Sequence, residues 1–357
     1  MTPSAGDRAA IRRLRRGIVP ASHVLSLSVG ADSNMAVISC ELDRLASGQG
    51  RACFIQGEWG AGKTHLLAVV RCLATKKGYA VAYLNLNGNS AALNQPQRFY
   101  HLIATRLQVP NVAPGLNALL QHWQSNPRLL ARLQTWALAN ANRMELASAF
   151  VDVLAHFSLA KSWTVLTGAD LAAADYGYKR DKALHRMSHL GDCLNAMGYG
   201  GLVLALDEAE MLEQLWNYRS RVGAYSTLGY LVGMRSVLPV FAVTERFERQ
   251  IQQDVISKAV MRDSCLTIPA SQFLTKWRHG VFPRVSPTAL TPQLAEVLVN
   301  RVVDLYGRTY GRPNGDLDTL GLLKTWSASP TRNPRNLIRR TLHALDMGRE
   351  MACSSGC

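Results

Sequence analysis

Residues 51–70 read RACFIQGEWGAGKTHLLAVV, and this stretch decides the fold class. Its centre, from Gly57 to Thr64, matches the pattern G-x-x-x-x-G-K-[ST]. An apolar run precedes the pattern and an amphipathic segment follows it, which indicates a strand, a loop and a helix in succession. Glycines let such a loop curl so that its backbone N–H groups point inward, and the helix N-terminus adds positive potential. The sequence therefore predicts a phosphate-binding loop.

Two residues of this loop have predicted chemical roles. We expect Lys63 to reach the terminal phosphates of a nucleoside triphosphate, and the Thr64 hydroxyl to bind Mg²⁺. ATP and Mg²⁺ are therefore the expected cofactors. The other predicted nucleotide-binding residues surround these two in the sequence: Gly57, Glu58, Trp59, Gly60, Ala61, Gly62 and His65. The structural alternative is a glycine-rich turn between a strand and a helix that binds no ligand.

The chain on both sides of the loop alternates between strand and helix patterns. YAVAYLNLN (79–87), GLVLALD (201–207) and VLPVFAVT (237–244) are typical of strands, and CLTIP (265–269) of a possible fifth. No strand pattern follows residue 271. Strands separated by helices predict a parallel sheet covered by helices on both faces. The predicted fold class is therefore α/β.

Composition and periodicity predict three parts. A basic N-terminal arm occupies 1–17 and carries five arginines. A phosphate-loop ATPase domain occupies 18–270 and contains a long, mainly helical insertion at about 90–198. A helical lid domain occupies 271–357. In the lid, Thr291 precedes Pro292, which is the signature of a capped helix start.

An acidic pair ends the most apolar strand pattern. Asp207 and Glu208 follow LVLAL directly. A carboxylate at the end of a buried strand must be paired or bind a metal, so Asp207 is the predicted second Mg²⁺ ligand. Glu208 is placed to polarise an attacking water as a general base. An acidic pair that merely caps the loop is the alternative, but together with the phosphate loop the pair favours hydrolysis.

Three other polar residues are candidates for contacts with the nucleotide. Thr244 ends the strand at 237–244 and is a candidate for contact with the γ-phosphate or the water; a strand-capping role is the alternative. Arg335 starts a helix in NPRNLIRR, from which its guanidinium could fold over the phosphates. Arg262 is a candidate arginine finger toward a neighbouring subunit, with an ordinary surface charge as the alternative.

The order of these motifs resembles that of the AAA+ ATPases, in the origin-recognition and STAND-like branch. It is more closely similar to the ATP-binding protein family of BREX phage-defence systems. The resemblance covers about 15–345 and rests on these segments: GEWGAGKTH, LALDEAE, RSRVGAYSTLGYLV, VFAVTERFE and NPRNLIRR. Two features depart from AAA+ proteins, namely the insertion and the lack of a clear winged-helix module after the lid.

The resemblance implies a role for each matching residue. It implies that 18–30 contacts adenine, that Thr244 is sensor 1 and that Arg335 is sensor 2. It implies phosphate-loop or Walker B roles for the following residues: Gly57, Gly62, Lys63, Thr64, Asp207 and Glu208. It also implies other defence-system subunits as partners.

The chain has 40 Lys+Arg against 25 Asp+Glu, a net charge of +15, while 48% of its residues are hydrophobic. That apolar fraction excludes a disordered polycation, and the apolar runs are too short for a membrane span. A nucleotide needs only one or two positive groups. The surplus in the arm, insertion and lid therefore predicts DNA as a partner, with a merely solubilising surface as the alternative. Aromatic residues among these charges could stack on bases, but core positions are the favoured interpretation: Trp123, Trp136, Trp163, Tyr176 and Tyr178.

The leading hypothesis is a Mg²⁺-dependent, self-associating ATPase that acts on or near DNA in phage defence. Its seven cysteines are scattered and form no C-x-x-C pair, which indicates a reducing cytoplasm. The alternative is an ATP-dependent protein-interaction switch without DNA contact. A small-molecule phosphotransferase is a third hypothesis, which the acidic pair disfavours because it suits water as the nucleophile.

Overall fold

The computed structural model describes residues 5–86, 93–156, 160–172, 178–215, 217–256, 267–311, 317–329 and 332–354. The chain divides into two compact units. The first unit is formed by Met1–Met35, Trp59–Cys72 and Pro287–Cys357, and the second by Ala36–Glu58 and Leu73–Ser286.

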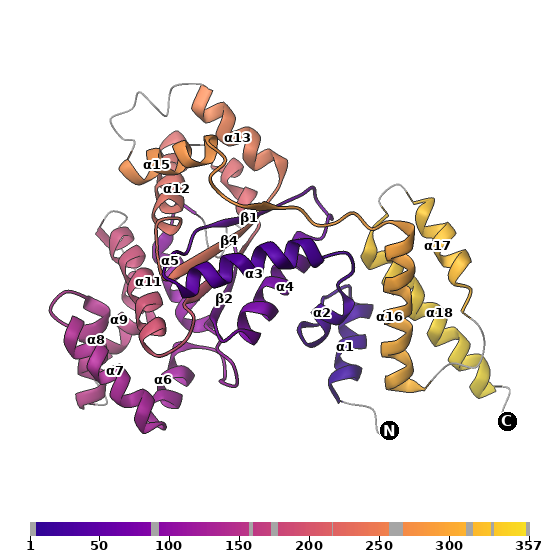
Figure 1. The fold of residues 1–357 in the computed structure, drawn as a ribbon, viewed down its shortest axis with the longest axis horizontal. Coiled ribbons are helices and arrows are strands. Elements are labelled where there is room, and N and C mark those ends of the chain that lie inside the picture. The colour runs from indigo at the N-terminus through magenta and orange to yellow at the C-terminus, as the bar shows by residue number, and fades with distance from the viewer. Residues whose placement is uncertain are drawn as a thin grey trace. The chain divides into compact units, whose positions relative to one another are not determined.

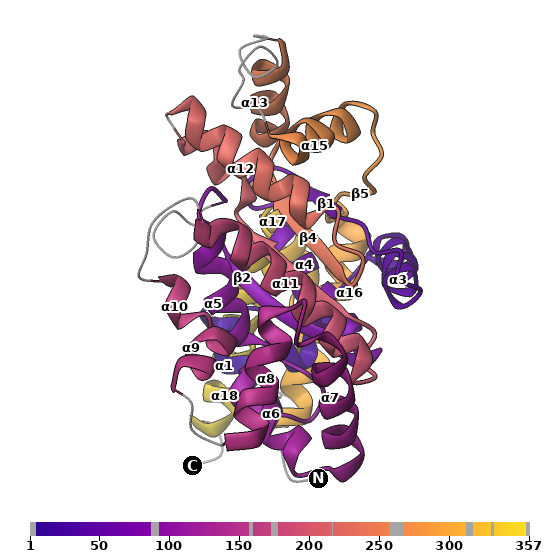
Figure 2. The same cartoon turned by 90° about the vertical axis from the view of Figure 1, so that its left-hand side faces the viewer.

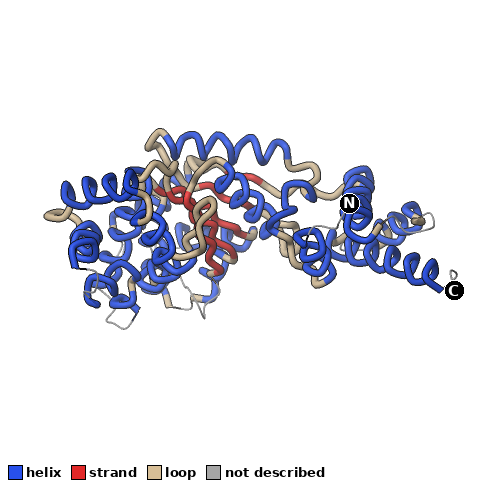
Figure 3. The backbone as a smooth tube through the Cα atoms, turned by 90° about the horizontal axis from the view of Figure 1, so that it is seen from below, coloured by secondary structure: helices blue, strands red, loops and turns tan. Residues whose placement is uncertain are grey.

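A five-stranded sheet forms the centre of the second unit (Figure 1; strands red in Figure 3). Its strands are β1 (Cys53–Gln56), β2 (Ala80–Asn85), β3 (Leu202–Asp207), β4 (Val237–Val243) and β5 (Arg284–Val285). The order is β2-β3-β4-β1-β5, and all neighbouring strands are parallel. Every residue of β3 and β4 is buried, as expected for strands covered on both faces. The predicted α/β class and parallel sheet are confirmed.

The strand predicted at 265–269 is wrong where the structure describes it. Thr267 caps a helix, α15 (Ile268–Arg278), by accepting a backbone hydrogen bond with its hydroxyl. Pro269 occupies the first turn, and a Thr cap followed by Pro is a helix start signal. The side chain of Ile268 is 75% exposed, so its apolar character does not report a buried strand.

The fifth strand lies farther along the chain. β5 pairs with β1 in parallel, with Arg284 opposite Phe54 and Val285 opposite Ile55. The expectation that no strand follows residue 271 is therefore wrong. A strand of two residues is too short to show the alternation by which strands are recognised in a sequence.

A run of helices connects β2 to β3 in the second unit (Figure 2). Its members are α5 (Pro96–Arg106), α6 (Leu116–Gln124), α7 (Pro127–Asn140), α8 (Glu145–His156), α9 (Ala160–Thr167), α10 (Ala169–Ala172) and α11 (Tyr178–Ala196). Trp123 is fully buried among them, and Trp136 and Trp163 are partly buried against the same core. These three are therefore core residues, as favoured above. Tyr176 and the side chain of Tyr178 lie outside the described part.

One cation is buried within these helices. Arg186 of α11 has a side chain only 1% exposed. Its guanidinium donates two hydrogen bonds of 2.7 Å to Asp170 and another of 3.1 Å to Glu145. It also lies over the ring of Tyr100 on α5. Arg186 thus joins α5, α8, α10 and α11 around one ion-pair network.

The other helices of the second unit follow β3 and β4. They are η2 (Ala209–Gln214), α12 (Tyr218–Leu231), α13 (Glu245–Ile256) and α15. The buried carboxylate of Asp254 on α13 accepts hydrogen bonds from Arg221 and Tyr225 of α12. Burial and this carboxylate raise the pKa of Tyr225, so its hydroxyl stays a donor. Two helices, α3 (Asp32–Ala46) and α4 (Lys63–Lys76), begin in the first unit and end in the second.

The first unit combines both ends of the chain. Its further elements are α1 (Ala5–Arg15), η1 (Ala21–His23), α2 (Val24–Leu27), α16 (Pro292–Tyr310), α17 (Thr319–Ser327) and α18 (Pro334–Ser354). Ile11 and Leu14 of α1 share one buried cluster with Leu298 of α16 and Leu342 of α18. The predicted cap at Thr291 is confirmed, since its hydroxyl accepts from the N–H of Leu294. Among the helices of the described ranges, none has the length and hydropathy that a bilayer-spanning segment requires.

Candidate functional site

The predicted phosphate loop runs from the end of β1 to the start of α4. Gly60 and Gly62 have φ angles of 84° and 101°, a region that residues with a Cβ rarely adopt. The first backbone bond of the helix runs from the N–H of Leu66 to the carbonyl of Gly62. Lys63 opens the helix and is only 8% exposed. The loop thus has the strand–loop–helix context that its sequence pattern requires.

Other loop residues differ in exposure. Glu58 and Thr64 are exposed, and the indole of Trp59 is 83% exposed. Thr64 is therefore one of the residues of α4 that apolar packing does not cover.

Within the first unit, His65 contacts segment 18–30, for which the resemblance implies contact with adenine. Its Nε2 lies 2.8 Å from the hydroxyl oxygen of Ser28. Because Ser28 donates its hydroxyl proton to the carbonyl of Val24, His65 is the donor in this contact. Burial lowers the pKa of His65, so the ring is neutral at pH 7. Arg301 of α16 in turn donates to the carbonyls of Ser26 and Ser28.

The acidic pair lies at the carboxyl end of β3. Asp207 is 4% exposed, and both of its carboxylate oxygens accept hydrogen bonds. The hydroxyl of Tyr83 donates to Oδ2 at 3.0 Å, and the N–H of Glu208 donates to Oδ1 at 3.1 Å. Since β2 and β3 pair with Asn85 opposite Asp207, Tyr83 reaches Asp207 diagonally across the two strands. The carboxylate is therefore held in one orientation.

Glu208 has an unusual backbone. Its φ and ψ are 59° and 36°, which is the left-handed region, and this region costs a residue other than glycine about 1–2 kcal/mol. This conformation turns the chain sharply out of the sheet into η2 while the side chain stays only partly buried. Strain of this kind concentrates at functional sites.

Thr244 follows β4 at the same edge of the sheet. Its hydroxyl oxygen is buried, and no described residue hydrogen-bonds to it. Gly57 lies beside it, because the N–H of Gly57 donates to the carbonyl of Val243 at 3.1 Å. A buried hydroxyl without a partner is costly, so a ligand that supplied a polar atom here would remove that cost.

The two remaining predicted residues are arginines. Arg335 is exposed in the first turn of α18, in the first unit, where its backbone N–H donates to the side-chain oxygen of Asn333. Arg262 lies outside the described residues. The acidic pair, Thr244 and Gly57 thus meet at one edge of the sheet in the second unit, whereas Trp59–His65 and Arg335 belong to the first unit.

Tyr83 is not among the residues predicted from the sequence. The only signal for it was its alternation with Val81 and Asn85, which places it on the face of the sheet that also carries Asp207. Gln56 is also not among the residues predicted from the sequence. It ends β1 and donates to Glu248 of α13 at 2.8 Å, and Arg284 of β5 donates to the same carboxylate at 3.0 Å.

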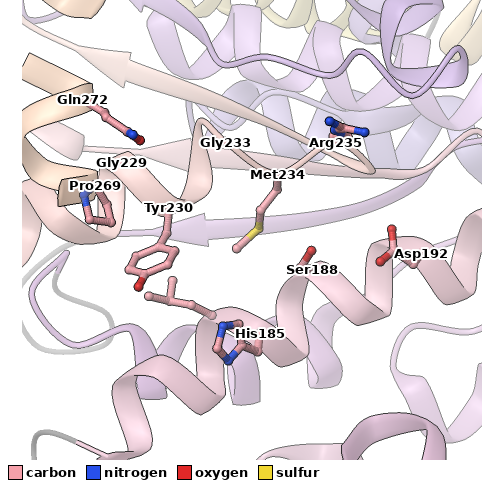
Figure 4. A pocket seen from close by; sticks show the side chains of 11 residues that line it. His185, Ser188, Asp192, Gly229, Tyr230, Gly233, Met234, Arg235, Pro269 and Gln272 are labelled. Atoms are coloured by element: carbon pink, nitrogen blue, oxygen red, sulfur yellow. The ribbon is translucent and has the colours of Figure 1, made fainter. Parts of the chain in front are cut away.

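The cavities in the described part of the second unit include one between helices and one beside η2. The larger, about 400 Å³, lies between α11, α12 and α15. Figure 4 shows His185, Ser188 and Asp192 along one helix, facing Tyr230 and Met234 across this cavity. Arg235 also lines it and precedes β4, so the cavity is near the amino ends of the strands, away from Asp207. The smaller, about 220 Å³, lies beside η2, directly after the acidic pair, and is lined by Leu86 and Leu93–Gln95 among others.

The donors at the carboxyl edge suit Mg²⁺ bound to a phosphate ligand. Asp207 offers a buried carboxylate, and hard oxygen ligands of this kind are those that Mg²⁺ prefers. Thr244 offers a hydroxyl with an unused hydrogen-bonding capacity. The residues present therefore fit the implied cofactor.

Comparison with known proteins gives one family. The family model described as BREX system ATP-binding protein BrxC/D matches residues 3–174 and 178–350. Neither the curated proteins nor the solved structures provide a match.

Proposed function

The chain belongs to the family of BREX system ATP-binding proteins BrxC/D, and from this premise we propose that it is a Mg²⁺-dependent ATPase acting on or near DNA in phage defence. ATP binding and the defence context follow from the family. Hydrolysis is the further step, and the observation that carries it is the acidic pair. Asp207 is buried and hydrogen-bonded on both oxygens, whereas Glu208 is strained and partly exposed. Adjacent carboxylates in such different settings suit different tasks.

The proposed roles follow from these settings. The backbone of Gly57–Gly62 and the ammonium of Lys63 would bind the phosphates, and Thr64 with Asp207 would hold Mg²⁺, which would supply neutralisation of the negative charge on the phosphates. Glu208 accepts the proton of the attacking water. Thr244 orients the water or the γ-phosphate with its unpartnered hydroxyl.

Tyr83 is a positioning residue in this scheme. Its hydroxyl fixes one oxygen of Asp207, which leaves fewer orientations for the carboxylate to lose on binding a cation. Because β2 leads into the helical insertion, Tyr83 also connects that insertion to the metal-binding carboxylate. Arg335 and Arg262 keep their proposed roles as sensor 2 and arginine finger.

A protein-interaction switch is a second candidate, and one observation favours it. Arg301 of the lid helix α16 binds the carbonyl of Ser28, and the hydroxyl of Ser28 contacts His65 next to the phosphate loop. A nucleotide bound near His65 would therefore act on the lid through the contacts of Ser28 and Arg301. In this case the lid presents a docking surface to another subunit, and hydrolysis only resets it.

Phosphate release from ATP tests the proposal, measured with and without Mg²⁺ and with and without duplex DNA. We expect turnover that needs Mg²⁺ and changes with DNA. Glu208→Gln should bind ATP normally yet lose turnover, whereas Glu213→Gln in η2 provides a matched control outside the proposed site. Equal turnover in Glu208→Gln and wild type would exclude Glu208 as the base. If ATP turnover does not change with DNA and the chain has no DNA affinity, the protein-interaction switch is favoured.

A further inference from the structure

Helix α1 has two faces of opposite character. Ala10, Ile11 and Leu14 are buried against α16 and α18 (Figure 1). The side turned away from this packing carries exposed arginines, and the turn after the helix adds one more: Arg8, Arg12 and Arg13 lie in α1, and Arg16 lies in the turn. Arg8, Arg12 and Arg16 are spaced four residues apart, so they form one stripe along the helix and the turn that follows it.

Helix α18 extends this stripe from the other end of the chain. The guanidinium of Arg339 donates to the backbone carbonyl of Arg15 at 3.1 Å. A Cβ on Gly17 would lie 3.6 Å from the same guanidinium, so Arg339 packs directly on the turn that ends α1. Arg340 follows Arg339 in the sequence and is also exposed, about 100° further around α18. We call the six residues the arginine face: Arg8, Arg12, Arg13, Arg16, Arg339 and Arg340.

Carboxylates do not neutralise the arginine face in the described part of the chain. Asp7, on α1 itself, pairs with His23 at 2.8 Å. Asp346, on α18, pairs with Arg15 at 2.7 Å and accepts from Tyr306. The carboxylates next to α1 are thus already occupied, and no ion pair between described residues involves any of the six arginines. Like charges gathered in this way repel one another and destabilise the unit, which an anionic partner would reverse.

We propose that the arginine face binds the phosphate backbone of duplex DNA without reading its sequence; this rests on the proposed function only in taking DNA as the partner. All six cations are arginines, whose planar guanidinium can bind phosphate oxygens in pairs. A basic amphipathic helix can also bind anionic membranes, but it does so by inserting its apolar face. In α1 that face is buried inside the first unit, so only the charges are available.

The face is built from both ends of the chain, and it is part of the unit that carries Lys63–Cys72. Arg301 and Ser28 connect α16 of this unit to His65. A duplex on the arginine face therefore binds the same compact unit as the start of the loop helix, which gives DNA a physical route to alter nucleotide affinity.

Duplex affinity measured against salt concentration tests the proposal. Fluorescence anisotropy with the full chain and a labelled duplex would be repeated over a series of KCl concentrations. In Arg339→Gln/Arg340→Gln, and in Arg8→Gln/Arg12→Gln, we expect weaker binding. The slope of log K against log salt should fall by about one for each phosphate that the variant no longer binds.

A matched control removes the same charge elsewhere. Arg128→Gln/Arg132→Gln changes two exposed arginines of α7 in the second unit, and it should leave both affinity and slope unchanged. Thermal unfolding of every variant shows whether the first unit remains folded, and charge removal in Arg8→Gln/Arg12→Gln should raise its midpoint slightly. The proposal is overturned if Arg128→Gln/Arg132→Gln lowers the slope of log K against log salt. It is also overturned if neither arginine-face variant changes that slope.

A vesicle experiment decides between DNA and membrane as the partner. Cosedimentation with phosphatidylserine vesicles should show no more binding by wild type than by Arg8→Gln/Arg12→Gln. Vesicle binding that depends on these arginines, in a chain without duplex affinity, would replace DNA by a membrane surface. Absence of ATP turnover in the wild type, in contrast, would contradict the proposed ATPase activity but not the proposed duplex binding.

Discussion

The residues of the predicted nucleotide site and the arginine face use charge in opposite ways. Lys63 and Asp207 are 8% and 4% exposed, and the carboxylate of Asp207 is hydrogen-bonded on both sides. The six residues of the arginine face are exposed and have no carboxylate partner among the described residues. Each buried charge has a large effect of its own, because low-dielectric surroundings strengthen its field. Exposed charges act as a group and are screened by salt. Single substitutions should therefore have large effects in the first region and small, salt-dependent effects in the second.

The largest effect is expected for Lys63→Ala. Loss of the buried ammonium should reduce kcat/KM for ATP by about 100-fold or more, as removal of one preorganised electrostatic group does. Lys76→Ala removes an exposed ammonium from the other end of α4 and should leave turnover near wild type. Steady-state phosphate release measures both variants. Similar losses of kcat/KM in the two would mean that the burial of Lys63 does not decide the effect.

Arg186→Ala should be the most damaging arginine substitution, although it lies far from both regions in the sequence. It leaves Asp170 and Glu145 without their shared cation and empties a buried site. Because these carboxylates are 33% and 39% exposed, we expect a cost of about 2 kcal/mol, which is less than for a fully buried pair. Arg132→Ala on α7 removes an exposed arginine and should cost little. Urea denaturation of both variants would show whether burial, rather than residue type, decides the effect.

Tyr83→Phe should reduce the affinity for Mg·ATP by about tenfold, since a hydrogen bond to a charged group contributes about 1.5 kcal/mol. ATP affinity in EDTA should not change, because Tyr83 acts through Asp207. Binding of a fluorescent ATP analogue with and without Mg²⁺ separates these cases. Equal losses under both conditions would mean that Tyr83 only supports the fold.

The smallest effect is expected for a single substitution on the arginine face. Arg12→Gln should weaken duplex binding about two- to fourfold at low salt, and the difference should shrink as salt is raised. Anisotropy titrations at two salt concentrations measure it. A loss as large as that of Lys63→Ala, or one that salt does not reduce, would mean that Arg12 makes a fixed contact instead of sharing a diffuse one.

Much of the sheet could be predicted because its strands carry local signals. β3 and β4 are continuous apolar runs, and β1 is marked by the loop that follows it. β5 has only two residues and owes its place to pairing with Phe54 and Ile55, which no local pattern reports. At Thr267, the same cap-and-proline signal that correctly predicted the helix at Thr291 was outweighed by the apolar residues around it.

The candidate site shows the same division between local and long-range information. The phosphate loop and the acidic pair are contiguous motifs, so their spacing in the sequence was sufficient to propose them. The role of Tyr83 depends on the register between β2 and β3, which are separated by the whole insertion. The docking of α1 on α16 and α18 joins opposite ends of the chain, and the arm predicted from charge alone gave no sign of it.

The packing of α1 has a consequence for the order in which the protein is made. Ribosomes add about 5–20 residues per second, so α1 emerges tens of seconds before its partners beyond Pro292. During that interval Ile11 and Leu14 have no α16 to cover them. The nascent segment is then a basic amphipathic helix whose apolar face is exposed. The first unit can form completely only after α16 and α18 have been synthesised. Synthesis thus delays the formation of the arginine face until the rest of the chain exists.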